Sequence, residues 1–178
     1  MTNTLIVNLL GGSGCGKSKT ACRLFAMLKD DYIDCELVNE YVKDMVWEGR
    51  NKVFECQPYI FGKQYYKLFR VNGKVEVIIT DRPIFLDLVY GDSEGKHFKQ
   101  HVLEKFRSFN NLNVYLNRVD SFNPNGRNES NIEEARICDN KIIKCLKETK
   151  TPYIIADGNK EGCEFIYKII KGRLKYDK

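Results

Sequence analysis

No apolar run in this sequence approaches the roughly 20 residues that a membrane-spanning helix requires, so we expect no membrane partner. Met1-Thr2-Asn3-Thr4 opens directly into a strand-like run, which argues against a signal or transit peptide and favours a cytoplasmic location. Internal repeats, low-complexity tracts and linkers between domains are also lacking. Residues 1–178 are therefore expected to form a single domain with an ordinary buried core.

The sequence also lacks the cysteine and histidine spacings of a metal site. Its seven cysteines include no Cys-x-x-Cys pair, and they stand at positions 15, 22, 35, 56, 138, 145 and 163. This pattern predicts reduced thiols, and neither a disulfide framework nor a zinc site. His97 and His101 are four residues apart on an expected helix, but no third ligand is near them, which favours a solvated face.

A large excess of one charge is missing as well. The net charge of +5 suits an anionic small molecule, and it is too modest to demand a nucleic acid as partner. Because Lys and Arg are spread along the whole chain, a nucleic-acid partner is left open but is not favoured. The sequence also leaves a homodimer open.

The chain is organised around a glycine-rich segment that lies between a strand-like run and a helix-like run. Its Gly-x-x-x-x-Gly-Lys-Ser pattern begins at Gly11 and ends at Ser18. Glycines recur because backbone N–H groups can converge on a phosphate only in conformations that are closed to bulky residues. The N-terminus of the following helix adds a partial positive charge. The pattern assigns nucleotide binding to Gly11, Gly12, Ser13, Gly14, Cys15, Gly16, Lys17, Ser18 and Lys19.

Two side chains of this segment have separate expected roles. Lys17 reaches the terminal phosphates as a mobile point charge, and the Ser18 hydroxyl completes the ligand shell of a Mg²⁺ ion. The alternative interpretation, a glycine-rich turn that binds nothing, is disfavoured because the strand, the helix and all four pattern residues are present. ATP and Mg²⁺ are therefore the expected cofactors.

Strand-like and helix-like patterns alternate along the rest of the chain. Strands are predicted at 4–10, 35–39, 74–80, 112–116 and 152–156. Helices are predicted at about 17–29, 41–47, 53–69, 95–109, 132–146 and 160–174. This alternation predicts an α/β fold, with a five-stranded parallel sheet between two layers of helices.

Acidic residues follow two of these strands. Asp81 ends the third predicted strand and is the expected second magnesium anchor, while Glu40 ends the second strand, where ligands gather in open α/β sheets. Gln57 and Gln64 lie seven residues apart on one face of a predicted helix rich in aromatic residues. One of these glutamines is expected to hold a planar base, and the sequence does not decide which; Tyr90 is a further candidate for the acceptor site.

The polar segment from Asn117 to Asn131 is too long for a simple connection. It contains Arg118 and Arg127, and Arg136 follows in the next helix, which Ser130-Asn131-Ile132-Glu133 is expected to open as a capping box. These arginines are either ordinary surface charge or part of a lid. We favour a lid at about 117–131, which closes over the phosphates and brings positive charge to the transferring group.

With these motifs together, the chain resembles the P-loop nucleoside and nucleotide kinases, and within them the small NadR-type "AAA domain" kinases that bacteriophages often encode. A phage-encoded protein would act in the host cytoplasm. The resemblance implies that Asp81 holds Mg²⁺ or orients the acceptor and that Arg82 braces the acceptor. It also implies that Glu40 is the base facing the acceptor hydroxyl. The resemblance further implies that Arg118 and Arg127 bind the triphosphate, with Arg136 as a third candidate. It also implies that Asp157 and Gly158 border the adenine.

Two residues depart from the pattern of deoxynucleoside kinases. Tyr41 follows Glu40 where those kinases usually have Pro, and Pro83 follows Arg82 where Ser or an aromatic residue is common. The departures concern the acceptor, which is expected to be a (deoxy)nucleoside or a nucleoside monophosphate. The rivals are a kinase that acts on a modified base in phage DNA and an NTP-hydrolysing switch module. The expected catalytic residues are Lys17, Glu40, Asp81, Arg82 and Arg127.

Overall fold

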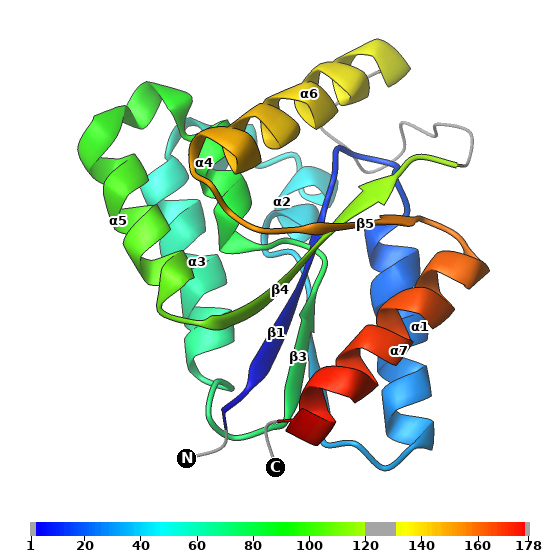
Figure 1. Ribbon diagram of the computed structural model, residues 1–178. Coiled ribbons are helices and arrows are strands. Elements are labelled where there is room, and N and C mark those ends of the chain that lie inside the picture. The colour runs from blue at the N-terminus through cyan, green and yellow to red at the C-terminus, as the bar shows by residue number, and fades with distance from the viewer. Residues whose placement is uncertain (1–2, 120–130, 177–178) are drawn as a thin grey trace.

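In the computed structural model, described for residues 3–119 and 131–176, five parallel strands form one sheet between two helical layers (Figure 1). The strands are β1 (Leu5–Leu10), β2 (Cys35–Val38), β3 (Val77–Thr80), β4 (Asn110–Asn117) and β5 (Ile154–Asp157). Their order is β2-β3-β1-β4-β5, so the first strand lies at the centre of the sheet. The predicted five-stranded parallel α/β fold is confirmed.

Within the described residues, seven α-helices and three short 3₁₀ helices accompany the strands. The helices are α1 (Lys17–Asp30), α2 (Val42–Trp47), α3 (Gln57–Phe69), α4 (Asp87–Tyr90), α5 (Gly95–Arg107), α6 (Ile132–Glu148) and α7 (Lys160–Tyr176). The 3₁₀ helices are η1 (Asn51–Glu55), η2 (Ile84–Leu86) and η3 (Asp92–Glu94). Across these ranges, none of the helices combines the length and the apolar character that crossing a membrane would take.

Strand β1 is buried on both faces, as its continuous apolar sequence requires. Leu5, Val7 and Leu9 join the core under α1 and α7, whereas Ile6 and Leu10 join the core under α3 to α6. Figure 1 shows these two helical layers on opposite faces of the sheet. Strand β1 pairs with β3 on one side and with β4 on the other, so the strands that follow it are added on both of its sides. Ligands of such open parallel sheets bind at the position where the strand order changes side.

Several predicted element boundaries were wrong, among them the starts of α3 and β3, and the N-cap of α6 also differs. The helix predicted from Val53 begins only at Gln57, because η1 precedes it and Pro58 stands in the first turn, where its missing N–H costs nothing. Strand β3 begins at Val77, three residues later than predicted. The cap of α6 is not Ser130, which lies outside the described residues: the Asn131 side chain accepts a hydrogen bond from the Glu134 N–H (2.9 Å).

Candidate functional site

The glycine-rich turn after β1 takes a conformation that only glycine adopts easily. Gly11, Gly14 and Gly16 have φ values of 138°, 79° and 97°, all in the left-handed range. A Cβ on Gly11 would lie 2.5 Å from the Cys15 sulfur, so the turn also has no room for a side chain there. The sequence pattern and the backbone conformation therefore agree at three of the four glycines of the motif.

The N–H groups at the start of α1 form the phosphate-binding part of this turn. Within the described residues, the backbone N–H groups of Gly14, Gly16, Lys17 and Ser18 donate no hydrogen bond to the protein. Gly16 is the N-cap of α1, so these donors lie at the positive end of the helix dipole. Such a cluster of free donors fits an anionic phosphate group.

The Lys17 ammonium group lies over the same turn. It donates to the Gly11 carbonyl oxygen (2.6 Å) and the Gly12 carbonyl oxygen (2.9 Å). Gly11 and Gly12 are buried, whereas Lys17 is partly exposed, and its four-carbon stem allows the charge to move toward a bound phosphate. The placement thus agrees with the expected role of Lys17 as a mobile cation.

Ser18 and Asp81, the two residues predicted to bind Mg²⁺, lie in direct contact. The Ser18 hydroxyl donates to Asp81 Oδ2 (2.6 Å), and the Glu40 N–H donates to Asp81 Oδ1 (3.0 Å). A hydroxyl and a carboxylate beside a phosphate site fit Mg²⁺, which keeps several waters and takes few protein ligands. The described residues contain no larger His, Cys, Asp or Glu cluster that could hold a metal ion.

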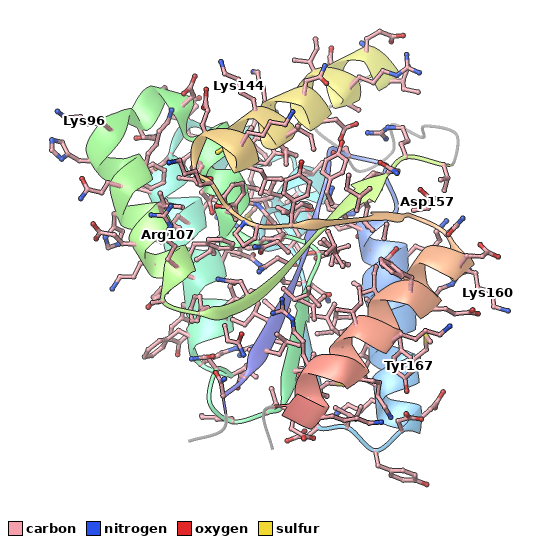
Figure 2. The ribbon with its side chains drawn as sticks, in the orientation of Figure 1. Lys96, Arg107, Lys144, Asp157, Lys160 and Tyr167 are labelled. Carbon is pink, nitrogen blue, oxygen red and sulfur yellow. The ribbon has the colours of Figure 1, made fainter. Side chains whose placement is uncertain are left out.

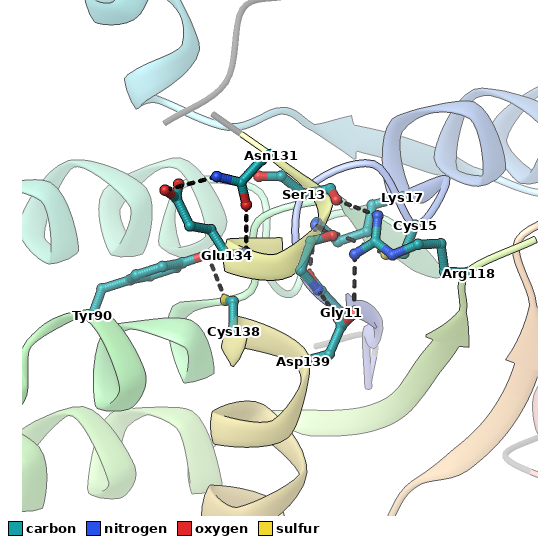
Figure 3. Close-up of polar contacts among 11 residues, drawn as sticks. Gly11, Ser13, Cys15, Lys17, Tyr90, Arg118, Asn131, Glu134, Cys138 and Asp139 are labelled. Carbon is teal, nitrogen blue, oxygen red and sulfur yellow. Dashed lines mark hydrogen bonds and ion pairs between the residues drawn. The ribbon is translucent and has the colours of Figure 1, made fainter. Parts of the chain in front are cut away.

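A residue that the sequence analysis missed, Asp139 of α6, contacts this turn directly (Figure 3). Its Oδ1 accepts a hydrogen bond from the Gly12 N–H (2.5 Å), and its Oδ2 pairs with Arg118 Nη2 (3.0 Å). Arg118 Nη1 in turn donates to the Ser13 carbonyl oxygen (2.5 Å). Asp139 therefore ties α6, the end of β4 and the phosphate-binding turn together.

The close fit at Gly12 shows how tightly α6 packs there. A Cβ at this position would lie 2.6 Å from the Ala135 carbonyl oxygen and 2.9 Å from Asp139 Oδ1. The Arg118 Nε is buried and has no hydrogen-bond partner, which leaves one donor of the guanidinium unused beside the turn. Arg118 thus lies next to the glycine-rich turn, and its role as a clamp on the triphosphate stays a prediction.

Replacing Asp139 with alanine should weaken nucleotide binding about tenfold or more, because the variant frees Arg118 and leaves the Gly12 N–H without its charged acceptor. Titration calorimetry with ATP and Mg²⁺ measures the change. Glu148→Ala, an exposed acid at the far end of the same helix, is the control and should bind like the original protein. An unchanged dissociation constant for Asp139→Ala would show that this contact does not shape the turn.

The loop between β5 and α7 forms the opposite wall of the turn. A Cβ on Gly158 would come within 2.1 Å of the Cys15 carbonyl oxygen, so the loop backbone packs directly on the P-loop. Asp157 ends β5, just before this loop (Figure 2). Its Oδ1 accepts a hydrogen bond from the Asn117 side chain (3.0 Å). Asp157 and Gly158 thus lie next to the phosphate-binding turn, and their contact with the adenine stays a prediction.

The two glutamines that the sequence could not separate have different surroundings. Gln64 is fully buried: its Oε1 accepts from the Tyr41 N–H (3.0 Å), and its Nε2 donates to the Asn39 carbonyl oxygen (3.4 Å). Gln64 therefore holds the chain beside Glu40. The Gln57 Oε1, by contrast, is buried without any hydrogen-bond partner.

Arg82 is held in a buried ion pair that the sequence analysis did not predict. Its guanidinium donates to both carboxylate oxygens of Asp87 (2.8 and 2.9 Å), and it lies 5.4 Å from the ring centre of Tyr90. Burial opposes the charge of Arg82, but Asp87 outweighs it and the nearby Glu40 adds to this, so the pKa of Arg82 is raised. Asp87 thus fixes the position of Arg82 independently of any acceptor.

Three predicted residues remain: Tyr90, Arg136 and Arg127. Tyr90 borders a pocket with Glu134 and Cys138, and its hydroxyl lies 3.5 Å from the Cys138 sulfur. Arg136 is exposed on α6. Arg127 and most of the predicted lid lie outside the described residues, so the lid stays a prediction.

Comparison with known proteins agrees with this geometry. The family model described as an AAA domain matches residues 6–161, whereas a search of curated proteins gave no significant match. One of the matching solved structures, "Crystal structure of NadR protein in complex with NR", aligns over 96% of this chain with a TM-score of 0.64 and 13% sequence identity. This chain spans 50% of that chain, and at such identity the likeness shows the fold alone.

Family and fold both agree with the resemblance inferred from the sequence motifs. The family match spans the glycine-rich turn, Asp81 and the arginine-bearing segment, which are the features on which that resemblance depended. Nucleotide binding follows from this family and from the conformation of the turn. The chain belongs to the AAA domain family of P-loop NTPases.

Proposed function

We propose that the protein transfers the γ-phosphoryl group of ATP to a small acceptor, a (deoxy)nucleoside or a nucleoside monophosphate. The observation that carries this proposal is the contact between Ser18 and Asp81 at the start of α1, with the Glu40 N–H on the other oxygen of the same carboxylate. It brings the expected metal ligands and the expected acceptor base to one point. A protein that only hydrolyses nucleotide has little use for an acceptor base there.

In this proposal the free N–H groups of the turn bind the phosphates, and Lys17 neutralises the charge that develops on the transferring group. Ser18 and Asp81 would hold Mg²⁺, which would supply positive charge to the phosphates. Positioning and electrostatic stabilisation provide most of the catalysis, since the transition state is loose. Arg118, tied to Asp139, adds a fixed positive charge beside the turn.

On the acceptor side, when the acceptor is a nucleoside, Glu40 takes the proton of the attacking hydroxyl group. The acceptor oxygen forms a bond to the γ-phosphorus as the bond to the β-phosphate oxygen breaks, and ADP leaves. Gln64 and Lys67 hold the backbone before Glu40, because both donate to the Asn39 carbonyl oxygen. The matching NadR structure is titled as a complex with NR, which supports including a nucleoside among the acceptors to be tested.

The test is ATP consumption with Mg²⁺ against a panel of nucleosides, deoxynucleoside monophosphates and nicotinamide riboside, with the products resolved by mass. Turnover that depends on one panel member would establish the kinase, and chelation of Mg²⁺ should stop it. Slow hydrolysis that is indifferent to every small acceptor would overturn the proposal in favour of a switch module. Phosphate transfer to DNA alone would replace the small acceptor with a polymer.

Gln57→Leu should raise the KM for the acceptor about tenfold while leaving the KM for ATP and the stability of the fold unchanged. The reason is that the buried Gln57 Oε1 has no partner within the protein, so the fold loses no hydrogen bond from it, whereas a bound base would lose one. Steady-state kinetics and a thermal melt measure the two effects. Gln64→Leu is the contrast, because it removes both contacts to the Glu40 segment and should lower the melting temperature.

A further inference from the structure

The surface formed by α2 and α3 exposes an unusual number of aromatic side chains. Trp47, Tyr59, Tyr66 and Phe69 are exposed by 66%, 43%, 63% and 59%. They account for four of the ten large hydrophobic side chains that are exposed in the described chain. Large aromatic groups concentrated on one part of a soluble surface indicate an interaction site.

The same part of the chain carries most of the net positive charge. Residues 41–74 contain seven Lys or Arg and only three Asp or Glu, so this segment holds four of the five net positive charges of the protein. The even distribution of lysines along the sequence concealed this imbalance, because the acidic residues are concentrated elsewhere. The α2–α3 surface is therefore both aromatic and cationic.

On α3 the two kinds of side chain alternate along one face. Tyr59, Lys63, Tyr66 and Arg70 follow one another at spacings of four, three and four residues, which places them on the same side of a helix. Gly62, beside this stripe, leaves open space where a side chain would stand. The Lys63 ammonium lies 5.4 Å from the ring centre of Tyr59, so cation and ring are already adjacent.

We propose that this α3 stripe, Tyr59-Lys63-Tyr66-Arg70, is a docking surface for single-stranded nucleic acid. Unpaired bases stack on exposed rings, and phosphates pair with the cations between them. The two tyrosines are separated by about 10 Å along the helix, which leaves room for a lysine-bound phosphate between two stacked bases. A second copy of this surface would bring like charges together, so charge complementarity favours a polyanion.

The stripe begins beside the proposed acceptor site. The Tyr59 hydroxyl lies 2.9 Å from the Tyr41 hydroxyl, and Tyr41 directly follows Glu40 in the chain. A single-stranded nucleic acid bound along α3 would therefore approach the edge of the β-sheet where Glu40 and Asp81 lie. The docking surface itself does not depend on the proposed phosphoryl transfer, because none of its four residues contacts the phosphate-binding turn.

The experiment measures fluorescence anisotropy of a labelled 20-nucleotide single strand of mixed sequence at several salt concentrations. The original protein should bind, with an affinity that falls as salt rises. Tyr66→Ala should weaken binding about tenfold, and Lys63→Glu should also lower the slope of log affinity against log salt by about 0.7 or more.

Matched controls lie on α7, which covers the opposite face of the sheet (Figure 1). Phe165→Ala and Lys168→Glu remove an exposed aromatic and an exposed cation there, and both variants should bind like the original protein. Lys17→Ala should bind as well, which separates this inference from the proposed catalysis. Absence of binding at low salt, equal losses in the α7 variants, or equal affinity for duplex DNA would overturn the proposal.

Discussion

Replacing Lys17 with alanine should reduce phosphoryl transfer by about 10³-fold or more, down to the background of the assay, while the fold stays intact. Lys17 is the mobile cation of the phosphate-binding turn, and the variant removes charge stabilisation from the transition state. Its hydrogen bonds in the protein go to the carbonyl oxygens of Gly11 and Gly12 and to the Cys15 sulfur, at a partly buried position. Their loss should cost about 1 kcal/mol of stability or less.

This prediction is checked by single-turnover transfer from labelled ATP, together with a thermal melt of the same sample. Lys29→Ala is the matched control, since Lys29 is a cation in the last turn of the same helix, far from the phosphate-binding turn. The control should keep full activity. A normal rate in the Lys17 variant would mean that the glycine-rich turn is not the site of catalysis.

Much of this site could be predicted because its residues are marked by local patterns. The glycine spacing before Lys17 reflects backbone conformations with positive φ, and these belong to the turn itself. Asp81 stands directly after an apolar strand, and parallel strands end at a common edge, so its contact with Ser18 follows from the topology. The fold and the phosphate-binding part of the site could therefore be predicted from local sequence patterns.

The contacts of Asp139 could not be predicted in the same way. Its partners Gly12 and Arg118 are 127 and 21 residues away, and no short motif links such positions. A weaker signal was present: Asp139 stands among the buried positions of α6, between Ala135 and Ile142. An acid within the apolar stripe of a helix needs a buried partner, and this requirement would have singled it out.

The acceptor side was harder to predict for the same physical reason. Gln57 and Gln64 occupy equivalent positions on one helical face. They differ because the loop after β2 forms hydrogen bonds with the side-chain amide of Gln64. Likewise, Arg82 was assigned to the acceptor from its motif, although Asp87 takes up two of its donors. The sequence indicated the residues of the cleft, whereas their partners depend on packing between distant segments.

Replacing Asp87 with alanine should have the largest effect on stability, about 3–5 kcal/mol. The carboxylate is fully buried and makes the bidentate pair with Arg82, so its removal leaves an uncompensated guanidinium in the core. Because a domain is stable by only about 5–15 kcal/mol, the variant should unfold at a much lower denaturant concentration. Urea denaturation measures the shift, and Asp92→Ala, which breaks an exposed pair with Lys99 nearby, should leave the midpoint unchanged. An unshifted midpoint for Asp87→Ala would mean that the buried pair contributes little.

A paired replacement separates the structural role of Arg82 from its proposed role toward the acceptor. Arg82→Met with Asp87→Leu removes both charges and keeps the volume, so it should recover most of the stability lost in Asp87→Ala. Its rate then reports on Arg82 alone. If Arg82 braces the acceptor, the stable double variant transfers phosphate slowly and with a raised acceptor KM, because the guanidinium beside Tyr90 is gone. If the double variant is fully active, Arg82 belongs to the framework, and recognition of the acceptor depends on Glu40 and Gln57.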